Sequence, residues 1–222
     1  MKILTLEELA KAAKEYCIME SGDYKKELFG ITDGKAVGTF VEHRFQDFLS
    51  ERYEMSVGSS ATGLDLPSIN TDIKVTSIKQ PQSSCPFKDS KQKIYGLGYN
   101  IIVFVYRKYD DLKKRKGKLD FVSCSLIEAK RTGDYQTTTG LLNIIANNGN
   151  EDDVFAFLSD HKIPADEVTL MNMARDILKN PPLTGYLTIS NALQWRLQYG
   201  RIVNLEEDVD GIETIVKFSA DE

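Results

Sequence analysis

The sequence predicts an α/β fold with a mostly helical C-terminal portion, and three observations support this class. In the first fifty residues, apolar side chains recur at helical spacing between polar and charged ones. Between residues 53 and 127 the pattern changes to β-branched alternation and short continuous apolar runs, which are typical of strands. Helical spacing returns after residue 134. Helices on both sides of a set of strands favour a sheet with helices packed on it.

Two amphipathic helices are expected near the N-terminus. The first covers residues 5–19, where apolar side chains lie three or four positions apart, and Thr5 and Glu8 have the spacing of a capping box. Residues 30–38 are expected to form a loop. The second helix then covers residues 37–53, because a stripe of valine, phenylalanine and leucine side chains recurs there at helical spacing.

The strands are predicted from alternation and from apolar content. Short strands are expected at residues 53–57 and 64–66, and a longer one at residues 71–77, which alternates and carries β-branched side chains. The remaining elements are a short helix at 89–97, strands at 100–106, 119–127 and 211–218, and helices at 135–145, 152–158, 168–178 and 188–199.

Length and composition exclude several classes of protein. The chain has 222 residues, 41% of them hydrophobic and 27% charged, so it is neither disordered nor a membrane protein. The longest apolar run, residues 101–106, is too short to cross a bilayer. Charged residues interrupt the apolar residues near the N-terminus, so we expect no secretion signal and a cytoplasmic location. The three cysteines are scattered, which argues against a disulfide framework and a zinc site.

Charge is unevenly distributed along the chain. Residues 74–118 contain 12 basic and three acidic side chains, although the whole chain has a net charge of −5. A basic block inside an acidic chain favours one surface that faces a polyanion. The run from Lys113 to Lys116 has a second interpretation as an exposed turn, because charge runs often indicate only exposure to solvent.

The residues most suggestive of chemistry lie between positions 63 and 74. A tight turn centred on Ser68 and Ile69 would place Asp65 opposite Asp72, with Cβ atoms about 5 Å apart. Lys74 follows Asp72 by two positions and so projects from the same sheet face. Two opposed carboxylates repel each other, whereas a Mg²⁺ ion between them would find the oxygen ligands it requires. The adjacent ammonium group would orient an attacking water or a phosphate oxygen.

Glu42 is a candidate third carboxylate. On a helical wheel it lies at the edge of the apolar stripe of the second helix, from which it would reach toward the hairpin. In that position it would help to hold one or two metal ions. The alternative is an exposed glutamate beside a core stripe, which is where most helical glutamates are found.

Asp65, Asp72 and Lys74, preceded by a helix that carries Glu42, resemble the motif of the PD-(D/E)xK nuclease superfamily. This superfamily includes type II restriction endonucleases and the nicking enzyme of methyl-directed mismatch repair. The resemblance covers about residues 36–130. It implies a restriction-endonuclease-like core, in which a mixed central sheet has flanking helices. It also implies that Asp65, Asp72 and Glu42 bind metal, and that these three residues and Lys74 are catalytic.

The sequence departs from the usual motif in two ways. No proline precedes Asp65, although Pro67 follows it closely, and the second acid is Asp72 where glutamate is commoner. A competing set consists of Asp120, Glu128 and Lys130, which also has an acid two residues before a lysine. We rank that set lower, because a basic loop precedes it and no helical acid lies in a matching place. Neither of the two histidines lies in a nucleophile motif, which disfavours histidine-based nucleases and Ser/His hydrolases.

The polar segment after residue 77 is the expected DNA-binding segment. It leaves the proposed metal site, and glutamine, lysine and serine are side chains that pair with base edges or phosphates. An ordinary polar loop is the alternative. The predicted contacts are Lys79, Gln80, Gln82, Ser83, Ser84, Lys88, Lys91 and Lys93.

The residues and the resemblance together predict a Mg²⁺-dependent, sequence-specific endonuclease that cleaves double-stranded DNA and leaves 5′-phosphate ends, as type II restriction enzymes do. We expect one endonuclease domain over residues 1–222, with a catalytic core at about 36–130 and a helical subregion at about 134–222. A homodimer and a cognate DNA methyltransferase in the same system are expected partners. The alternatives are a DNA-repair nicking endonuclease and a non-catalytic DNA-binding protein.

Overall fold

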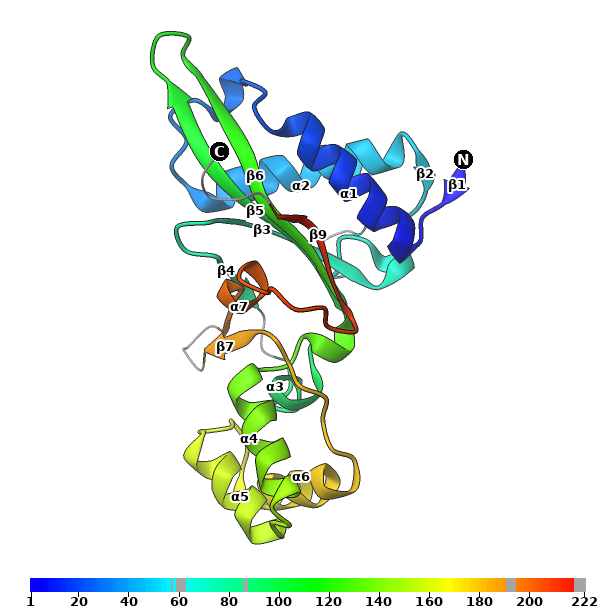
Figure 1. The fold of residues 1–222 in the computed structure, drawn as a ribbon, viewed down its shortest axis with the longest axis vertical. Coiled ribbons are helices and arrows are strands. Elements are labelled where there is room, and N and C mark those ends of the chain that lie inside the picture. The colour runs from blue at the N-terminus through cyan, green and yellow to red at the C-terminus, as the bar shows by residue number, and fades with distance from the viewer. Residues whose placement is uncertain (57, 59–62, 86–87, 191–194, 218–222) are drawn as a thin grey trace. The chain divides into compact units, whose positions relative to one another are not determined.

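The structure, a computed structural model, describes residues 1–222 except 57, 59–62, 86–87, 191–194 and 218–222 (Figure 1). The chain forms two compact units. Unit 1 comprises Met1–Ser83, Asn100–Ile127 and Glu206–Glu222, and unit 2 comprises Ser84–Tyr99 and Glu128–Leu205. Among the described residues, no helix has the length and apolar character needed to cross a membrane.

Unit 1 is built on a mixed four-stranded sheet. Its strands are β3 (Thr71–Ser77), β5 (Asn100–Asp111), β6 (Lys116–Ile127) and β9 (Ile212–Lys217), in the order β3-β5-β6-β9. β3 runs parallel to β5, whereas β5 and β6, and β6 and β9, are antiparallel. β3 begins and ends where the sequence predicts, and β5 and β6 are longer than expected because they continue into a shared hairpin.

Two helices of unit 1, α1 (Leu6–Glu20) and α2 (Gly34–Ser50), pack with the sheet (Figure 1). Aromatic rings join the two helices to the sheet. Tyr16 of α1 contacts Phe45 of α2 and Phe104 of β5 at centroid distances of 5.0 and 5.9 Å. α2 begins before the predicted position, because the Asp33 carboxylate accepts a hydrogen bond from the Lys35 N–H and caps the helix there. The mixed sheet with helices packed on it confirms the predicted α/β class.

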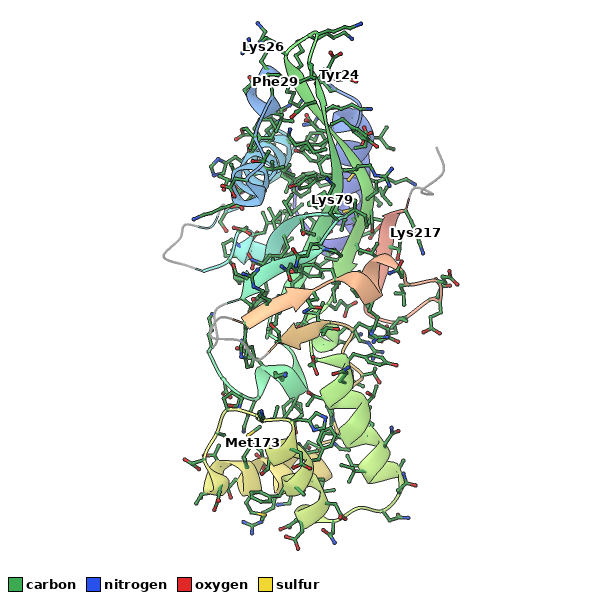
Figure 2. The ribbon with its side chains drawn as sticks, turned by 90° about the vertical axis from the view of Figure 1, so that its left-hand side faces the viewer. Tyr24, Lys26, Phe29, Lys79, Met173 and Lys217 are labelled. Atoms are coloured by element: carbon green, nitrogen blue, oxygen red, sulfur yellow. The ribbon has the colours of Figure 1, made fainter. Side chains whose placement is uncertain are left out.

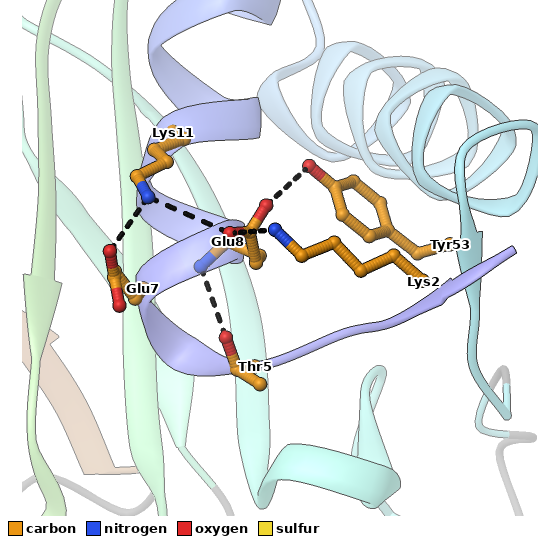
Figure 3. A network of polar contacts seen from close by, with 6 residues as sticks. All are labelled: Lys2, Thr5, Glu7, Glu8, Lys11 and Tyr53. Carbon is orange, nitrogen blue, oxygen red and sulfur yellow. Dashed lines mark hydrogen bonds and ion pairs between the residues drawn. The ribbon is translucent and has the colours of Figure 1, made fainter.

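The start of α1 is fixed by a small polar network (Figure 3). The Thr5 hydroxyl accepts a hydrogen bond from the Glu8 N–H at 3.3 Å, which confirms Thr5 as the N-cap. The Glu8 carboxylate binds the Lys2 ammonium at 2.6 Å and the Tyr53 hydroxyl at 3.3 Å. Lys2 lies in β1 (Lys2–Ile3) and Tyr53 in β2 (Tyr53–Glu54), so Glu8 ties this two-stranded parallel sheet to α1.

The strands predicted between residues 53 and 66 differ from those observed. β2 pairs with β1, and Leu66 contributes only an isolated bridge to Thr71. Within the described residues, the strand expected at 64–66 is therefore absent, and only residues 53–54 of the strand expected at 53–57 form one. The local pattern could not predict this pairing, because the partner of β2 is the N-terminal segment, about fifty residues away in the sequence.

The basic run forms the turn between β5 and β6. The side chains of Lys113, Lys114 and Arg115 are exposed, as the interpretation of the run as a solvated turn predicts. One Asp111 oxygen accepts hydrogen bonds from the Lys113 and Lys114 N–H groups at 2.9 and 3.0 Å. The turn is thus held by an aspartate cap, and part of its positive charge is balanced locally.

Unit 2 contains most of the predicted C-terminal helices. α4 (Tyr135–Ala146), α5 (Glu151–Asp160) and α6 (Glu167–Lys179) lie close to their expected positions, and α3 (Gln92–Tyr95) and α7 (Gly200–Val203) are short. Their core includes Leu141, Leu158 and Met173, the last of which is labelled in Figure 2. The capping of α4 by Asp134 and of α5 by Asn150 explains where these two helices begin.

The helix predicted at residues 188–199 is wrong. The described part of this segment forms β7 (Thr188–Ser190) and β8 (Trp195–Gln198), which pair antiparallel, and residues 191–194 lie outside the described residues. With β4 (Gln82–Cys85) they form a sheet of order β4-β8-β7. Trp195 and Leu197 are buried while Arg196 and Gln198 are exposed. This alternation is the period of a strand with one buried face.

Candidate active site

The candidate site is built on the turn that precedes β3. The Leu66 N–H donates to the Thr71 carbonyl at 3.0 Å, and the Thr71 N–H donates to the Leu66 carbonyl at 3.1 Å. Pro67–Ile69 forms a single 3₁₀ turn, and Asn70 closes it with a φ of 50°, a conformation that asparagine tolerates. This pairing confirms the predicted turn.

Asp65 lies beside β3, the edge strand of the sheet. Its Oδ2 accepts a hydrogen bond from the Ile73 N–H at 2.8 Å. The carboxylate therefore occupies a position that a neighbouring strand would otherwise fill, and its orientation is fixed by the backbone of β3. Gly63 and Leu64, which precede Asp65, do not lie in a strand, so the position of Asp65 depends on this hydrogen bond and on the turn.

Asp72 is buried on β3, with 7% of the residue exposed. Burial and a hydrogen bond between the Asp65 and Asp72 side chains raise the pKa of Asp72, the Lys74 charge lowers it, and together they set this pKa at about 6. Lys74 Nζ lies 2.6 Å from Asp72 Oδ2. The structure therefore brings Asp65, Asp72 and Lys74 together, as the sequence predicts.

The donor set fits a divalent cation. Two carboxylates lie side by side, one of them buried, and a single ammonium group faces them. Ionising both acids leaves an excess negative charge that a bound cation would balance, and carboxylate oxygens are ligands that Mg²⁺ accepts.

Glu42 does not complete a three-carboxylate group. It is half-buried on α2, next to the buried Val41. Among the residues that the structure describes, no three histidine, cysteine, aspartate or glutamate side chains are grouped closely enough to hold a metal ion. The structure thus supplies two of the three predicted metal ligands as a pair and leaves Glu42 apart from them.

The competing set is not assembled around one point. Lys118 pairs with Asp120 at 3.1 Å, and Lys130 pairs with Glu128 at 3.1 Å. Asp120 belongs to unit 1 and Glu128 to unit 2. Because β6 continues to Ile127, Asp120 lies roughly 20 Å from the end of the strand. This separation favours the site at Asp65 and Asp72.

The family model described as "Type II restriction enzyme NspV" matches residues 3–214. A curated relative, the type II restriction enzyme NspV of Nostoc sp., is 50% identical over 217 residues, which cover 98% of this chain and 99% of the relative. The chain belongs to the NspV family of type II restriction enzymes. This confirms the predicted resemblance to restriction endonucleases and identifies a site-specific deoxyribonuclease, whose substrate is DNA. No solved structure matches the chain.

In this restriction enzyme the turn after β3 is fixed by a residue that the sequence analysis did not single out. Thr76 is buried, with 6% of the residue exposed. Its hydroxyl donates to the Gln80 and Gln82 carbonyls, at 3.2 and 3.1 Å. It also accepts a hydrogen bond from the Gln82 N–H at 3.0 Å. Thr76 lies two positions beyond Lys74 on the same face of β3, and that spacing is the signal that would have identified it.

The predicted DNA-binding residues differ in exposure. Lys79, labelled in Figure 2, is exposed, and so are Gln80, Ser84, Lys88 and Lys91. Gln82 and Ser83 are half-buried. Lys93 is buried, which lowers its pKa, and its ammonium lies 6.0 Å from the Trp195 ring centroid. The Lys93 side chain therefore lies in the interior of unit 2.

Proposed function

We propose that this restriction enzyme hydrolyses both strands of its DNA site with Mg²⁺ held by Asp65 and Asp72, leaving 5′-phosphate ends. The observation that supports the proposal is the paired carboxylates, which face Lys74 at the edge of β3. When bound, the ion polarises the scissile phosphate and lowers the pKa of a water molecule.

Each side chain of the pair has a separate task. The hydrogen bond from the Ile73 N–H holds the Asp65 carboxylate in one orientation, so its remaining lone pairs are already positioned to bind the ion. Asp72 is buried and supplies a charge that is only weakly hydrated. Lys74 exchanges its contact with Asp72 for one with the attacking water or a phosphate oxygen, where its positive charge stabilises the transition state. We propose that Glu42 contributes less to metal binding than Asp65 and Asp72 do, so that its loss slows cleavage less than the loss of either aspartate.

The exposed side chains after β3 are proposed to contact DNA. Lys79 and Gln80 follow directly from the strand that carries Asp72 and Lys74, so a duplex cleaved there passes close to them. The other proposed contacts are Gln82, Ser83, Ser84, Lys88 and Lys91. We further propose a cytoplasmic homodimer that acts on a symmetric site, together with a methyltransferase that protects the host DNA.

Plasmid cleavage tests the proposal. The wild-type chain is expected to cut supercoiled plasmid in Mg²⁺ and to stop in EDTA. Asp72→Ala and Lys74→Ala are expected to abolish cutting. Asp120→Asn provides a matched control, because Asp120 also pairs with a lysine two positions away in unit 1. Cutting by Asp72→Ala at the wild-type rate would contradict the proposal, and open circles without linear product would indicate a nicking enzyme.

A further inference from the structure

Unit 2 contains a row of four contacting side chains in which two tyrosines lie between two arginines, in the order Arg131, Tyr186, Tyr135 and Arg201. The Arg201 guanidinium lies 3.5 Å from the centroid of the Tyr135 ring. Tyr135 meets Tyr186 in an edge-to-face contact with centroids 6.1 Å apart. The Arg131 guanidinium lies 5.9 Å from the Tyr186 ring centroid. We call these four residues the Arg–Tyr stack.

The backbone that carries the two tyrosines is rigidly held. The Tyr186 N–H donates to the Arg131 carbonyl at 2.9 Å, and the Tyr135 N–H donates to the Leu187 carbonyl at 2.8 Å. Gly185 packs so closely that a Cβ atom there would lie 2.2 Å from the Gly133 backbone. The rings are therefore presented by a fixed scaffold, and little side-chain freedom remains to be lost when a ligand binds.

Arg201 has no ion-pair partner among the residues that the structure describes. Its side chain is exposed. Asp134, the acid adjacent to Tyr135, is buried and occupied: Oδ2 accepts from the Thr137 N–H and hydroxyl, and Oδ1 accepts from the Ile189 N–H. The capping aspartate thus serves the scaffold and does not neutralise the stack.

Acidic residues of unit 2 are concentrated away from the stack in the sequence. Seven of its ten acidic residues lie between positions 150 and 179, in the segment that forms α5 and α6. The rest of the unit, which includes all four residues of the stack, carries seven basic and three acidic side chains. The stack therefore belongs to the part of unit 2 whose sequence is basic, which favours an anionic ligand.

We propose that the Arg–Tyr stack binds phosphates of the DNA backbone. The phosphate contact is assigned to Arg201, whose guanidinium lies over the Tyr135 ring and forms no ion pair among the described residues, so that its N–H groups can meet the oxygens of a phosphate. Arg131 instead donates to the Thr184 carbonyl at 3.1 Å and supports the Tyr186 ring. Such contacts position a duplex without reading its sequence. The inference rests on the proposed function only in taking double-stranded DNA as the substrate, and it adds contacts from residues other than those that follow β3.

Equilibrium binding of the full-length chain to a labelled DNA duplex, in EDTA so that no cleavage occurs, tests this inference. Arg201→Gln is expected to weaken binding about tenfold and to reduce the slope of log Kd against log salt by about one. The same factor is expected for a duplex that contains the cleavage site and for one that does not. Arg201→Lys keeps the charge but not the planar stack, so a two- to fivefold loss is expected.

Arg175→Gln is the matched control, because Arg175 is an exposed arginine of unit 2 that pairs with Glu151 on α5. Its affinity and salt slope are expected to equal those of the wild type. An unchanged affinity and slope for Arg201→Gln, or an equal loss in Arg175→Gln, would overturn the inference. Tyr135→Leu, with folding verified by thermal unfolding, gives a second test, because losing the ring without any loss of affinity would also contradict it.

The cleavage assay separates this inference from the proposed function. If the wild-type chain cuts plasmid and Asp72→Ala does not, the function stands whatever the Arg201 variants show. If the wild-type chain neither binds nor cuts DNA, the proposed function itself fails.

Discussion

Two carboxylate–lysine pairs in unit 1 have the same composition and spacing but different surroundings. On β3, Lys74 binds Asp72, and on β6, Lys118 binds Asp120, each across two positions of a strand. The Asp72 side chain is 10% exposed, whereas that of Asp120 is 32% exposed. Asp72 also has a second carboxylate, Asp65, beside it. Burial and a second acid therefore distinguish a candidate metal site from an ordinary surface ion pair, although the local motifs are alike.

The largest expected contrast between the two pairs is in cleavage. Asp72→Asn removes a ligand charge from the proposed site and is expected to lower the cleavage rate at least about a thousandfold. Asp120→Asn is expected to change it less than about twofold. Glu42→Gln should fall between them. Single-turnover cleavage of plasmid DNA measures all three, and similar rates for the Asp72 and Asp120 variants would remove the distinction between the pairs.

The pH dependence of metal use gives the next contrast. The pKa of Asp72 is raised to about 6 by burial and by Asp65, and a cation must displace the proton that Asp72 binds below that pH. The Mg²⁺ concentration for half-maximal cleavage is therefore expected to rise about tenfold for each unit below pH 6. A constant Mg²⁺ requirement between pH 5 and 8 would contradict this expectation. Asp120→Asn should follow the wild-type profile.

In the absence of metal, removing the Asp72 charge is expected to raise the free energy of unfolding, although it lowers the cleavage rate. Because the raised pKa of Asp72 means that the folded state binds a proton more tightly, the resulting stabilisation is complete below the unfolded pKa, near 4, and is lost as the pH rises through 6. Above pH 6, in EDTA, Asp72→Asn is therefore expected to unfold with a free energy on the order of 1–2 kcal/mol higher than the wild type. Urea unfolding at pH 4 and pH 7.5 measures this, and Asp120→Asn is the control. An Asp72→Asn variant that is less stable at pH 7.5 would contradict the assigned burial cost.

The smallest effect is expected at Thr76, which connects β3 to the turn with Gln80 and Gln82. Thr76→Val keeps the shape but loses the hydroxyl, so we expect a roughly threefold loss of discrimination between the preferred site and sites with one changed base pair. Thr76→Ser keeps the hydroxyl and should retain the discrimination. The ratio of cleavage rates at the two kinds of site is the measurement, and equal ratios for the valine and serine variants would argue against this role.

The sequence was most informative where structure depends on neighbours in the chain. β3, the turn at Pro67–Ile69 and the opposition of Asp65 and Asp72 all follow from alternation and turn chemistry within about a dozen residues. The burial of Lys93 and the pairing of β2 with β1 depend on partners distant in sequence. The wrong prediction at residues 188–199 had a different cause. Trp195, Leu197 and Tyr199 alternate at the period of a strand, but the apolar residues before them also fit helical spacing, and the helix was chosen.

The position of β9 in the sheet has a consequence for synthesis of the enzyme. β9 pairs with β6, yet 84 residues of chain, most of them in unit 2, separate Ile127 from Ile212. During translation, the edge of β6 that pairs with β9 therefore stays without its partner strand until residue 217 has left the ribosome. A DNA-cutting protein built in this order acquires its four-stranded sheet only after unit 2 has been synthesised.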